Sequence, residues 1–237
     1  MISPCMTSLD IDAIFFDLDG TLFDKWKAEE LALMKIYDIY DDVFAGVSRD
    51  EMIHAFREAN KLGHKEFHER KSLDKIRSDR GKRIMDMLGV DMSFADEFTS
   101  QFYEIYPRMD VPIEGAERVV NESLSRYDVG MISNGSEDVQ MAKLEVLGMT
   151  DKFEVILFSE AVGIRKPDRK IFDMASDKMG YENEDCLYVG DSYKSDMMGA
   201  GGAGMHTCWM NPEGKKKGAD YEPDLEITGL SQLLEKI

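Results

Sequence analysis

Residues 13–24 read AIFFDLDGTLFD, an apolar run that ends in two acidic residues one position apart. Four apolar residues followed by a Gly-Thr turn are typical of a short buried strand. Burying carboxylates is costly unless they are paired, hydrogen-bonded or bound to a metal. We therefore expect this strand to deliver Asp17 and Asp19 to the edge of a sheet, where such partners can reach them.

The chain has 237 residues, of which 43% are hydrophobic and 32% charged, and its formal net charge is -18. These proportions are those of an ordinary globular protein. The acidic excess argues against a nucleic acid polymer as a partner, because phosphate backbones are bound by surfaces rich in Lys and Arg. An anionic substrate would require a cation held locally in the site.

The cysteines Cys5, Cys186 and Cys208 show no Cys-x-x-Cys spacing. Cys186 and Cys208 lie in apolar, strand-like stretches, so we expect them to be buried and reduced. The N-terminal residues lack the basic and apolar regions of a signal peptide, and no apolar run approaches the ~20 residues of a membrane span. The sequence thus predicts a cytoplasmic protein without membrane contact, and it carries no signal for oligomeric state.

Short apolar runs alternate with helical patterns along most of the chain. The expected strands are 13–16, 129–133, 155–159, 186–190 and 206–210, and clear helical patterns cover 137–147 and 169–179. Strands that alternate with helices indicate a parallel sheet built from right-handed crossovers. We predict an α/β fold with a Rossmann-like, doubly wound parallel sheet, whose ligands bind beyond the carboxyl ends of the strands.

One interval interrupts this alternation with helical patterns alone. The amphipathic stretches are 26–40, 49–62 and 94–106, and Pro and Gly in MDVPIEG (109–115) mark the return of the chain. We expect residues 25–109 to form an inserted all-helical cap, and residues 1–24 and 110–237 to form the core. An insertion at the end of the first strand is placed like a lid, and we expect it to close during the reaction.

Polar residues follow each of the first four core strands. They are DLDGT (17–21), SNGSED (133–138), IRKPD (164–168) and GDSYKSD (190–196). Asp17, Asp19 and Asp191 would repel one another at a shared edge, and a hard cation such as Mg²⁺ would relieve this repulsion. Ser133 at a helix start and Lys166 suit a phosphate group. An ionised carboxylate could then attack phosphorus while a second acid moves the proton.

These four segments resemble the motifs of the haloacid dehalogenase superfamily, in its phosphatase branch with a helical, C1-type cap. The matching stretches are DLDGT (17–21), ISNGS (132–136), RKPD (165–168) and GDSYKSD (190–196). The resemblance covers the chain from about Ile11 to Trp209. All four motifs occur in order, which makes an accidental match improbable.

The resemblance implies a role for each matched residue. Asp17 would be the nucleophile and Asp19 the general acid/base, with Lys166 counted among the catalytic residues. Ser133, Asn134 and Lys166 would bind the phosphoryl group. The metal ligands would be Asp17, the backbone carbonyl of Asp19, and Asp191, with Mg²⁺ as the cofactor. Asp196 would orient the metal ligands by hydrogen bonding.

Other reactions run on the same fold. Asp19 and the acidic fourth motif disfavour a dehalogenase, and Asp19 disfavours a phosphonatase, in which a small residue stands at that position. A sugar-phosphate mutase would keep every residue named above, so this alternative stays open. A catalytically silent binding module is disfavoured because the predicted nucleophile and metal ligands are all present.

Two core segments narrow the resemblance. Residues 158–175 and 189–211 are similar to nucleotidase-like members and to N-acylneuraminate-9-phosphate phosphatases. The implied substrate is a small phosphorylated metabolite, with a nucleoside monophosphate as one candidate and a phosphosugar or acylneuraminate phosphate as another. Candidate contacts in the insertion are Lys25, Trp26 and a basic cluster, which we interpret more readily as a solvated helix face. This cluster comprises Arg77, Arg80, Lys82 and Arg83.

Overall fold

The computed structural model describes residues 9–68 and 72–237. Two compact units make up the chain. The core unit runs up to Lys25 and resumes at Asp110, and the helical unit is Trp26–Met109. Each unit has its own hydrophobic interior and is described separately below.

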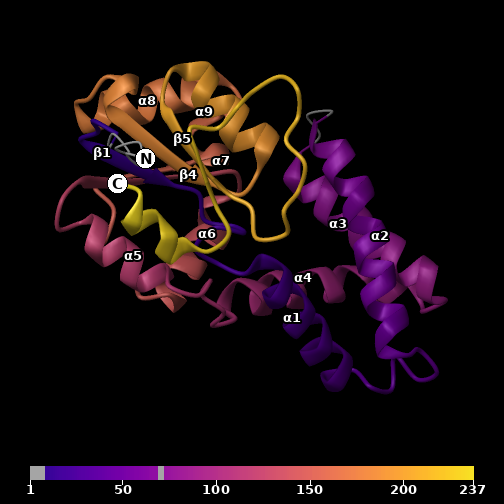
Figure 1. Ribbon diagram of the computed structural model, residues 1–237. Coiled ribbons are helices and arrows are strands. Elements are labelled where there is room, and N and C mark those ends of the chain that lie inside the picture. Colours follow the sequence, from indigo (N-terminus) through magenta and orange to yellow (C-terminus); the bar gives the residue numbers. More distant parts are fainter. Residues whose placement is uncertain (1–8, 69–71) are drawn as a thin grey trace. The chain divides into compact units, whose positions relative to one another are not determined.

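A six-stranded parallel sheet forms the centre of the core unit, in the order β3-β2-β1-β4-β5-β6 (Figure 1). Its strands are β1 (Ala13–Phe16), β2 (Asp128–Ser133), β3 (Val155–Phe158), β4 (Cys186–Gly190), β5 (His206–Met210) and β6 (Leu225–Ile227). The first five coincide with the predicted strands to within one residue. The edge strand β6 was not predicted.

The strand order confirms the predicted doubly wound α/β fold. β1 lies between β2 and β4, and Phe16 is in register with Met131 on one side and Val189 on the other. The connections lead outward from β1 in both directions, so the order of the strands reverses there. Ligands of such sheets bind beyond the strand ends at this reversal, which is where Asp17 follows β1.

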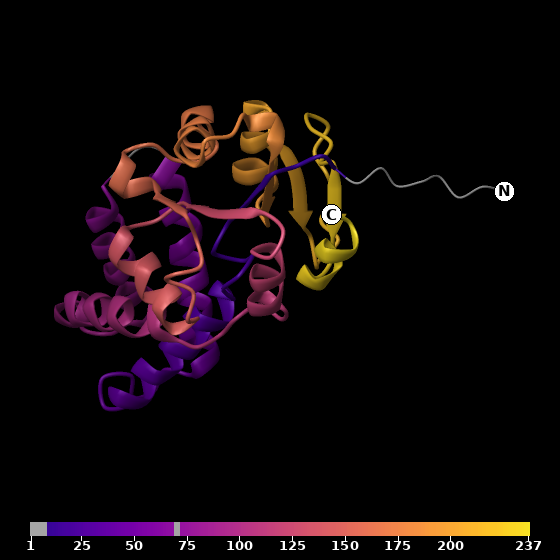
Figure 2. The same cartoon turned by 90° about the vertical axis from the view of Figure 1, so that its left-hand side faces the viewer.

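Helices cover both faces of the sheet. They are α5 (Ala116–Ser123), α6 (Glu137–Val146), α7 (Ser159–Val162), α8 (Arg169–Met179) and α9 (Met198–Ala203), with shorter helical turns η3 (Asn183–Asp185), η4 (Tyr193–Met197) and η5 (Leu230–Glu235). α8 and α9 pack together on one face, and their buried residues join those of β1, β2 and β4. The turn η5 packs beside α5 on the opposite face (Figure 2).

The helical unit contains α1 (Lys25–Ile39), α2 (Arg49–His68), α3 (Leu73–Leu88) and α4 (Ala95–Ile105), with short turns η1 (Met92–Phe94) and η2 (Tyr106–Arg108). α1 starts one residue before the unit boundary. Among the residues described, this unit is all-helical, as expected. Phe44, Phe56, Phe98 and Phe102 are buried in its interior and contact one another through their rings.

The basic cluster on α3 is not simply a solvated helix face. Arg80 turns inward, where it donates to Asn60 Oδ1 at 2.7 Å and to the hydroxyl of Tyr103 at 2.6 Å. Its guanidinium also lies over the rings of Phe56 and Phe102, 5.1 Å from each centroid. The interpretation is therefore wrong for Arg80, because aromatic rings and an amide replace the water that a solvated arginine would keep.

The chain leaves and re-enters the core at adjacent points. Asp24 N donates to Val111 O and Ile113 N donates to Leu22 O, both at 2.9 Å. Phe23 forms an isolated antiparallel bridge with Pro112 between these two bonds. A short ladder thus joins the outgoing and returning segments within the core unit.

Cys186 and Cys208 are free and buried, as expected, and burial raises the pKa of each thiol to about 12. Cys5 lies outside the described residues. None of the helices within residues 9–68 and 72–237 combines the length and the apolar character that a membrane span requires.

Candidate active site

The loop after β1 holds two carboxylates at different places. Asp17 is buried, and its backbone N–H donates to Val189 O on β4 at 2.9 Å. Gly20 turns the loop with φ 87°, and a Cβ there would lie 2.5 Å from Oδ2 of Asp191. Only glycine fits this position, because it accepts the positive φ and leaves the Asp191 carboxylate its space.

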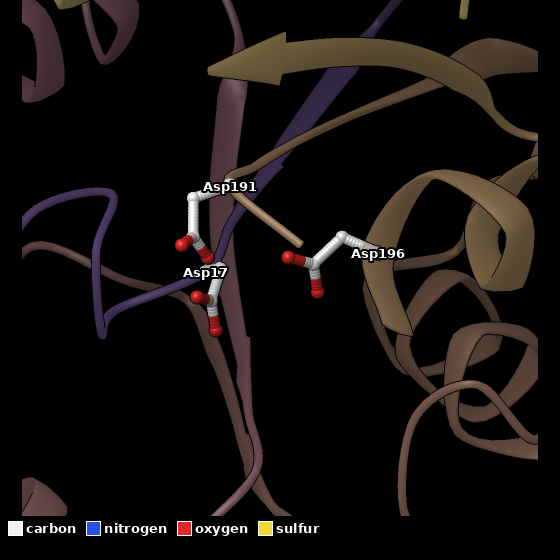
Figure 3. Close-up of side chains that lie close together, drawn as sticks. All are labelled: Asp17, Asp191 and Asp196. Atoms are coloured by element: carbon white, nitrogen blue, oxygen red, sulfur yellow. The ribbon is translucent and has the colours of Figure 1, made fainter. Parts of the chain in front are cut away.

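Three carboxylates converge at the sheet edge (Figure 3). Asp17 comes from the end of β1, Asp191 from the end of β4, and Asp196 from the helical turn η4. Carboxylate oxygens of the three lie within 4.8 Å of one another. Within residues 9–68 and 72–237, this is the acidic group whose geometry could hold a metal ion.

Hydrogen bonds hold the backbone of Asp191 and the carboxylate of Asp196. Trp209 on β5 donates from Nε1 to the carbonyl of Asp191 at 2.9 Å. The backbone N–H of Ser192 donates to Oδ2 of Asp196, also at 2.9 Å. The carboxylate of Asp196 is thus oriented by its own turn, and the main chain at Asp191 is held by a buried tryptophan on the neighbouring strand.

The electrostatics of the group show a shortage of positive charge. Burial raises the pKa of Asp17 to about 8, with the nearby Asp196 and Asp191 adding to the rise and the Lys166 ammonium opposing it. Burial likewise raises the pKa of Asp191 to about 7, again with Asp196 adding. A hard divalent cation would supply the missing charge, and an all-carboxylate donor set fits Mg²⁺.

Lys166 brings a buried cation into direct contact with this group. Its buried Nζ donates three hydrogen bonds of 2.7 Å, to Asp17 Oδ1, Asp196 Oδ1 and the hydroxyl of Tyr188. Burial alone would lower its pKa, but the charges of Asp17 and Asp196 raise it well above the ordinary value. The hydroxyl of Tyr188 in turn donates a hydrogen bond to the carbonyl of Ile132 at 2.8 Å.

The side-chain amide of Asn134 is hydrogen-bonded to the backbone of Lys166. Its Nδ2 donates to Lys166 O, and Lys166 N donates to its Oδ1, each at 3.0 Å. These bonds use one of the two N–H groups of Nδ2, so the sequence-based role for Asn134, donation to a phosphoryl group, stays a prediction. The geometry adds a role in placing Lys166.

The carboxylate of Asp19 lies outside the group of three and receives its hydrogen bonds from α6. Lys143 Nζ donates to its Oδ1 at 2.6 Å, and Gln140 Nε2 approaches its Oδ2 at 3.4 Å. Burial would raise the pKa of Asp19, but the charges of Lys143 and Lys25 hold it below its ordinary value. Gln140 also donates to Ser133 Oγ at 2.6 Å, so it joins the first and second motifs.

The structure therefore assembles most of the predicted site and adds residues to it. Asp17, Asp191, Asp196 and Lys166 meet directly, and Ser133 joins Asp19 through Gln140. The metal role predicted for Asp19 concerns its backbone carbonyl, and its carboxylate lies outside the acidic group. The residues that the sequence analysis missed are Gln140, Lys143 and Tyr188. The available signal was a Gln and a Lys three residues apart, directly after the second motif.

Comparisons with known proteins agree with this geometry. The family model described as haloacid dehalogenase-like hydrolase matches residues 11–204. Pyrimidine 5'-nucleotidase YjjG of Escherichia coli is 34% identical over 123 residues, which are 52% of this chain and 55% of that protein. That alignment spans little more than half of either chain.

Two further relatives match over nearly the whole length. Pyrimidine 5'-nucleotidase PynA of Streptococcus pneumoniae is 26% identical over 94% of this chain and 93% of its own. The crystal structure of YfnB from Bacillus subtilis, bound to magnesium, superposes with a TM-score of 0.84 at 25% identity, covering 95% of this chain and 97% of that one. The predicted family is thus confirmed: the chain is an enzyme that belongs to the haloacid dehalogenase-like hydrolases.

Proposed function

We propose that the protein is a Mg²⁺-dependent phosphomonoester hydrolase that works through an aspartyl-phosphate on Asp17. The observation that carries this proposal is the contrast between two neighbouring acids. Asp17 lies among carboxylates and the Lys166 ammonium, whereas Asp19 is held apart on the α6 side. One acid is thereby suited to bond formation and the other to proton transfer.

Asp17, Asp191 and the backbone carbonyl of Asp19 would hold the metal, with Asp196 orienting the group. When bound, Mg²⁺ would neutralise the phosphate oxygens and the clustered carboxylates. Lys166 supplies a further fixed positive charge next to the nucleophile, and Ser133 offers a hydroxyl from the adjacent loop. Preorganised charges of this kind stabilise the transferring phosphoryl group.

The proposed reaction has two steps, in which the phosphoryl group passes first to Asp17 and then to water. In the first, a carboxylate oxygen of Asp17 bonds to phosphorus, the phosphorus bond to the ester oxygen breaks, and Asp19 protonates the departing alcohol. In the second, water attacks phosphorus and gives its proton to Asp19, and the bond to Asp17 breaks. Inorganic phosphate leaves, and both carboxyl groups return to their starting forms.

Asp19 can take up a proton when the negatively charged substrate binds. Lys143 favours the ionised carboxylate in the structure described here. A bound phosphate adds negative charge near the loop, which favours the protonated acid. Asp19 can then act as an acid in the first step and as a base in the second.

We propose a small phosphorylated metabolite as the substrate, and nucleoside monophosphates are the first candidates. Support comes from YjjG and PynA, which are both named pyrimidine 5'-nucleotidases. The role of the helical unit as a cap that selects the substrate stays a prediction.

Phosphate release from p-nitrophenyl phosphate tests the reaction, in excess Mg²⁺ and in EDTA. We expect turnover with Mg²⁺ alone, loss of turnover in Asp17→Asn, and normal turnover in the exposed control Asp10→Asn. A panel of nucleoside monophosphates and sugar phosphates then tests the substrate class through kcat/KM. Absence of metal-dependent turnover across both sets would reject the phosphatase proposal.

A further inference from the structure

Lys143 is an unusual lysine because its charged end lies inside the core unit. Its side chain is 1% exposed, whereas the side chain of its partner Asp19 is 19% exposed. Nζ also donates to Gln140 Oε1 at 2.7 Å and lies 5.2 Å from the ring centroid of Phe23. A buried ammonium is costly unless several groups compensate it. Here a carboxylate, an amide and a ring provide that compensation.

Gln140 places this cation with respect to the second motif. Its carbonyl accepts from Lys143, and its amide donates to Ser133 Oγ and approaches Asp19 Oδ2. An amide whose oxygen and nitrogen are both engaged cannot turn over without losing bonds at each end. The position of Lys143 is thereby tied to Ser133, and the position of Asp19 to Lys143.

The helix and loop geometry make this arrangement possible. Gln140 and Lys143 are three residues apart on α6, so they share one face of the helix. The loop before α6 carries Gly135, where a Cβ would lie 3.0 Å from Cδ of Gln140. The absence of a side chain at Gly135 lets the amide pass close to the backbone and reach Ser133.

We propose that Lys143 is a positioning residue, which with Gln140 fixes the Asp19 carboxylate apart from Asp17 and ready for proton transfer. The proposal rests on the proposed function, in which Asp19 is the acid and base. A free Asp19 side chain could rotate, and a misplaced proton donor contributes little to catalysis. Lys143 therefore acts on the reaction through Asp19, the reacting group that it contacts directly.

A structural role alone would not explain the lysine. Buried ion pairs are weak contributors to stability, and apolar replacements of similar size are often neutral or better. Asp19 is partly exposed, so it can be solvated when its partner is removed. Replacement of Lys143 should therefore lower kcat/KM. The loss should be larger for leaving groups that need a proton more.

The test compares Lys143→Met with wild type on esters of increasing leaving-group basicity: p-nitrophenyl, phenyl and ethyl phosphate. For ethyl phosphate, we expect kcat/KM to fall by about 10²-fold, the lower end of the contribution of general acid catalysis. For p-nitrophenyl phosphate, whose leaving group needs no proton, the kcat/KM of Lys143→Met should stay within about threefold of wild type. The kcat and the KM of this variant for the same ester should fall together. The reason is that water attack on the aspartyl-phosphate still needs a base, so the second step becomes slower while the first does not.

Controls separate positioning from stability. Ala142→Gly weakens the same buried stretch of α6 but keeps the contacts of Lys143 and Gln140 with Asp19, so all esters should change by one common factor. Binding of beryllium fluoride with Mg²⁺, measured by calorimetry, should be unchanged in Lys143→Met. Asp17 and Lys166 are intact in this variant, and Gln140 still donates to Ser133. Lys143→Gln keeps a donor without the charge, and it carries the comparison if the methionine variant does not fold.

The outcomes are distinguishable. Equal losses on all three esters in the Lys143 variants, or weakened beryllium fluoride binding, would overturn the positioning role while wild-type turnover upheld the proposed function. Absence of Mg²⁺-dependent turnover in wild type would overturn the proposed function and this inference with it. A loss that grows with leaving-group basicity, beside unchanged beryllium fluoride binding, would establish the role.

Discussion

Lys166 donates a hydrogen bond from Nζ to Oδ1 of Asp17 across 2.7 Å, although 149 positions separate the two residues in the chain. The sheet brings them together because β1 and β4 are neighbours and the Tyr188 hydroxyl on β4 supports the ammonium. The contact fixes one oxygen of the proposed nucleophile. It also places a permanent positive charge where negative charge would develop during phosphoryl transfer.

Lys166→Met should lower kcat/KM for p-nitrophenyl phosphate by about 10²–10³-fold, since it removes one preorganised charge from the site. The measurement is steady-state kinetics at saturating Mg²⁺. Lys170→Met removes an exposed lysine four residues away and serves as the matched control, with activity expected near wild type. A loss below threefold in Lys166→Met would contradict the assigned role.

Asn134→Ala should lower kcat/KM by about tenfold, because it releases the backbone of Lys166 while leaving the ammonium present. A double-mutant cycle with Lys166→Met provides the check. Once Lys166 is gone, the Asn134 substitution should cost little more, so the two effects should be strongly non-additive. Independent, additive losses would instead indicate that Asn134 acts on the phosphoryl group itself.

The metal-free protein should lose stability as the pH rises from about 4 to about 8. The pKa of Asp17 is raised by burial from 3.8 to about 8, so between these values the native state holds a proton that the unfolded state has lost. The free energy of unfolding therefore falls with rising pH in this window. Asp191, raised to about 7, acts in the same direction.

Urea unfolding in EDTA at pH 5.5 and pH 8 measures this slope. Asp17→Asn should make the slope shallower, because the substituted amide does not titrate and the contribution of Asp191 is left. Mg²⁺ at a hundredfold excess over its Kd should restore about 2.7 kcal/mol at pH 8. A stability that rises with pH in EDTA would show that the carboxylates are not short of positive charge.

Gly20→Ala should weaken Mg²⁺ binding as well as the fold. The substitution forces alanine into a positive φ, at a cost of about 1–3 kcal/mol, and drives Cβ against the Asp191 carboxylate. Gly148→Ala is the matched control, since Gly148 also has a positive φ but meets nothing within 4 Å. Calorimetric Mg²⁺ titration should show weaker binding in Gly20→Ala only. Equal binding in both variants would remove Asp191 from the metal site.

The first five core strands were predictable because each is a short apolar run, and all of them except β3 are buried along most of their length. β6 escaped prediction because Leu225–Ile227 has three residues with a glutamate at its centre, and only its last residue is buried. α3 lacked a clear pattern for another reason. It is rich in charges and contains Gly81, which looks like a helix breaker but leaves room for Thr99, whose Oγ1 would lie 2.2 Å from a Cβ.

The site residues that directly follow a strand were predictable, since parallel strands bring their carboxyl ends to one edge of the sheet. The direction of the Asp19 side chain was not predictable, because it depends on Lys143, and a lone helical lysine is normally solvated. The bonds of Asn134 to Lys166 were hidden for a similar reason. They join two loops 32 positions apart, and neither loop specifies its partner by local pattern.

The ladder around Phe23 and Pro112 bears on how such a protein can change over evolutionary time. The inserted helices begin and end at two backbone segments that are already hydrogen-bonded to each other. An exchange of everything between these segments leaves both anchor points, and the catalytic loop ahead of them, in register. We therefore expect that the helical unit can be exchanged without loss of the core fold, and that on the proposed function such an exchange would change the substrate and keep the chemistry.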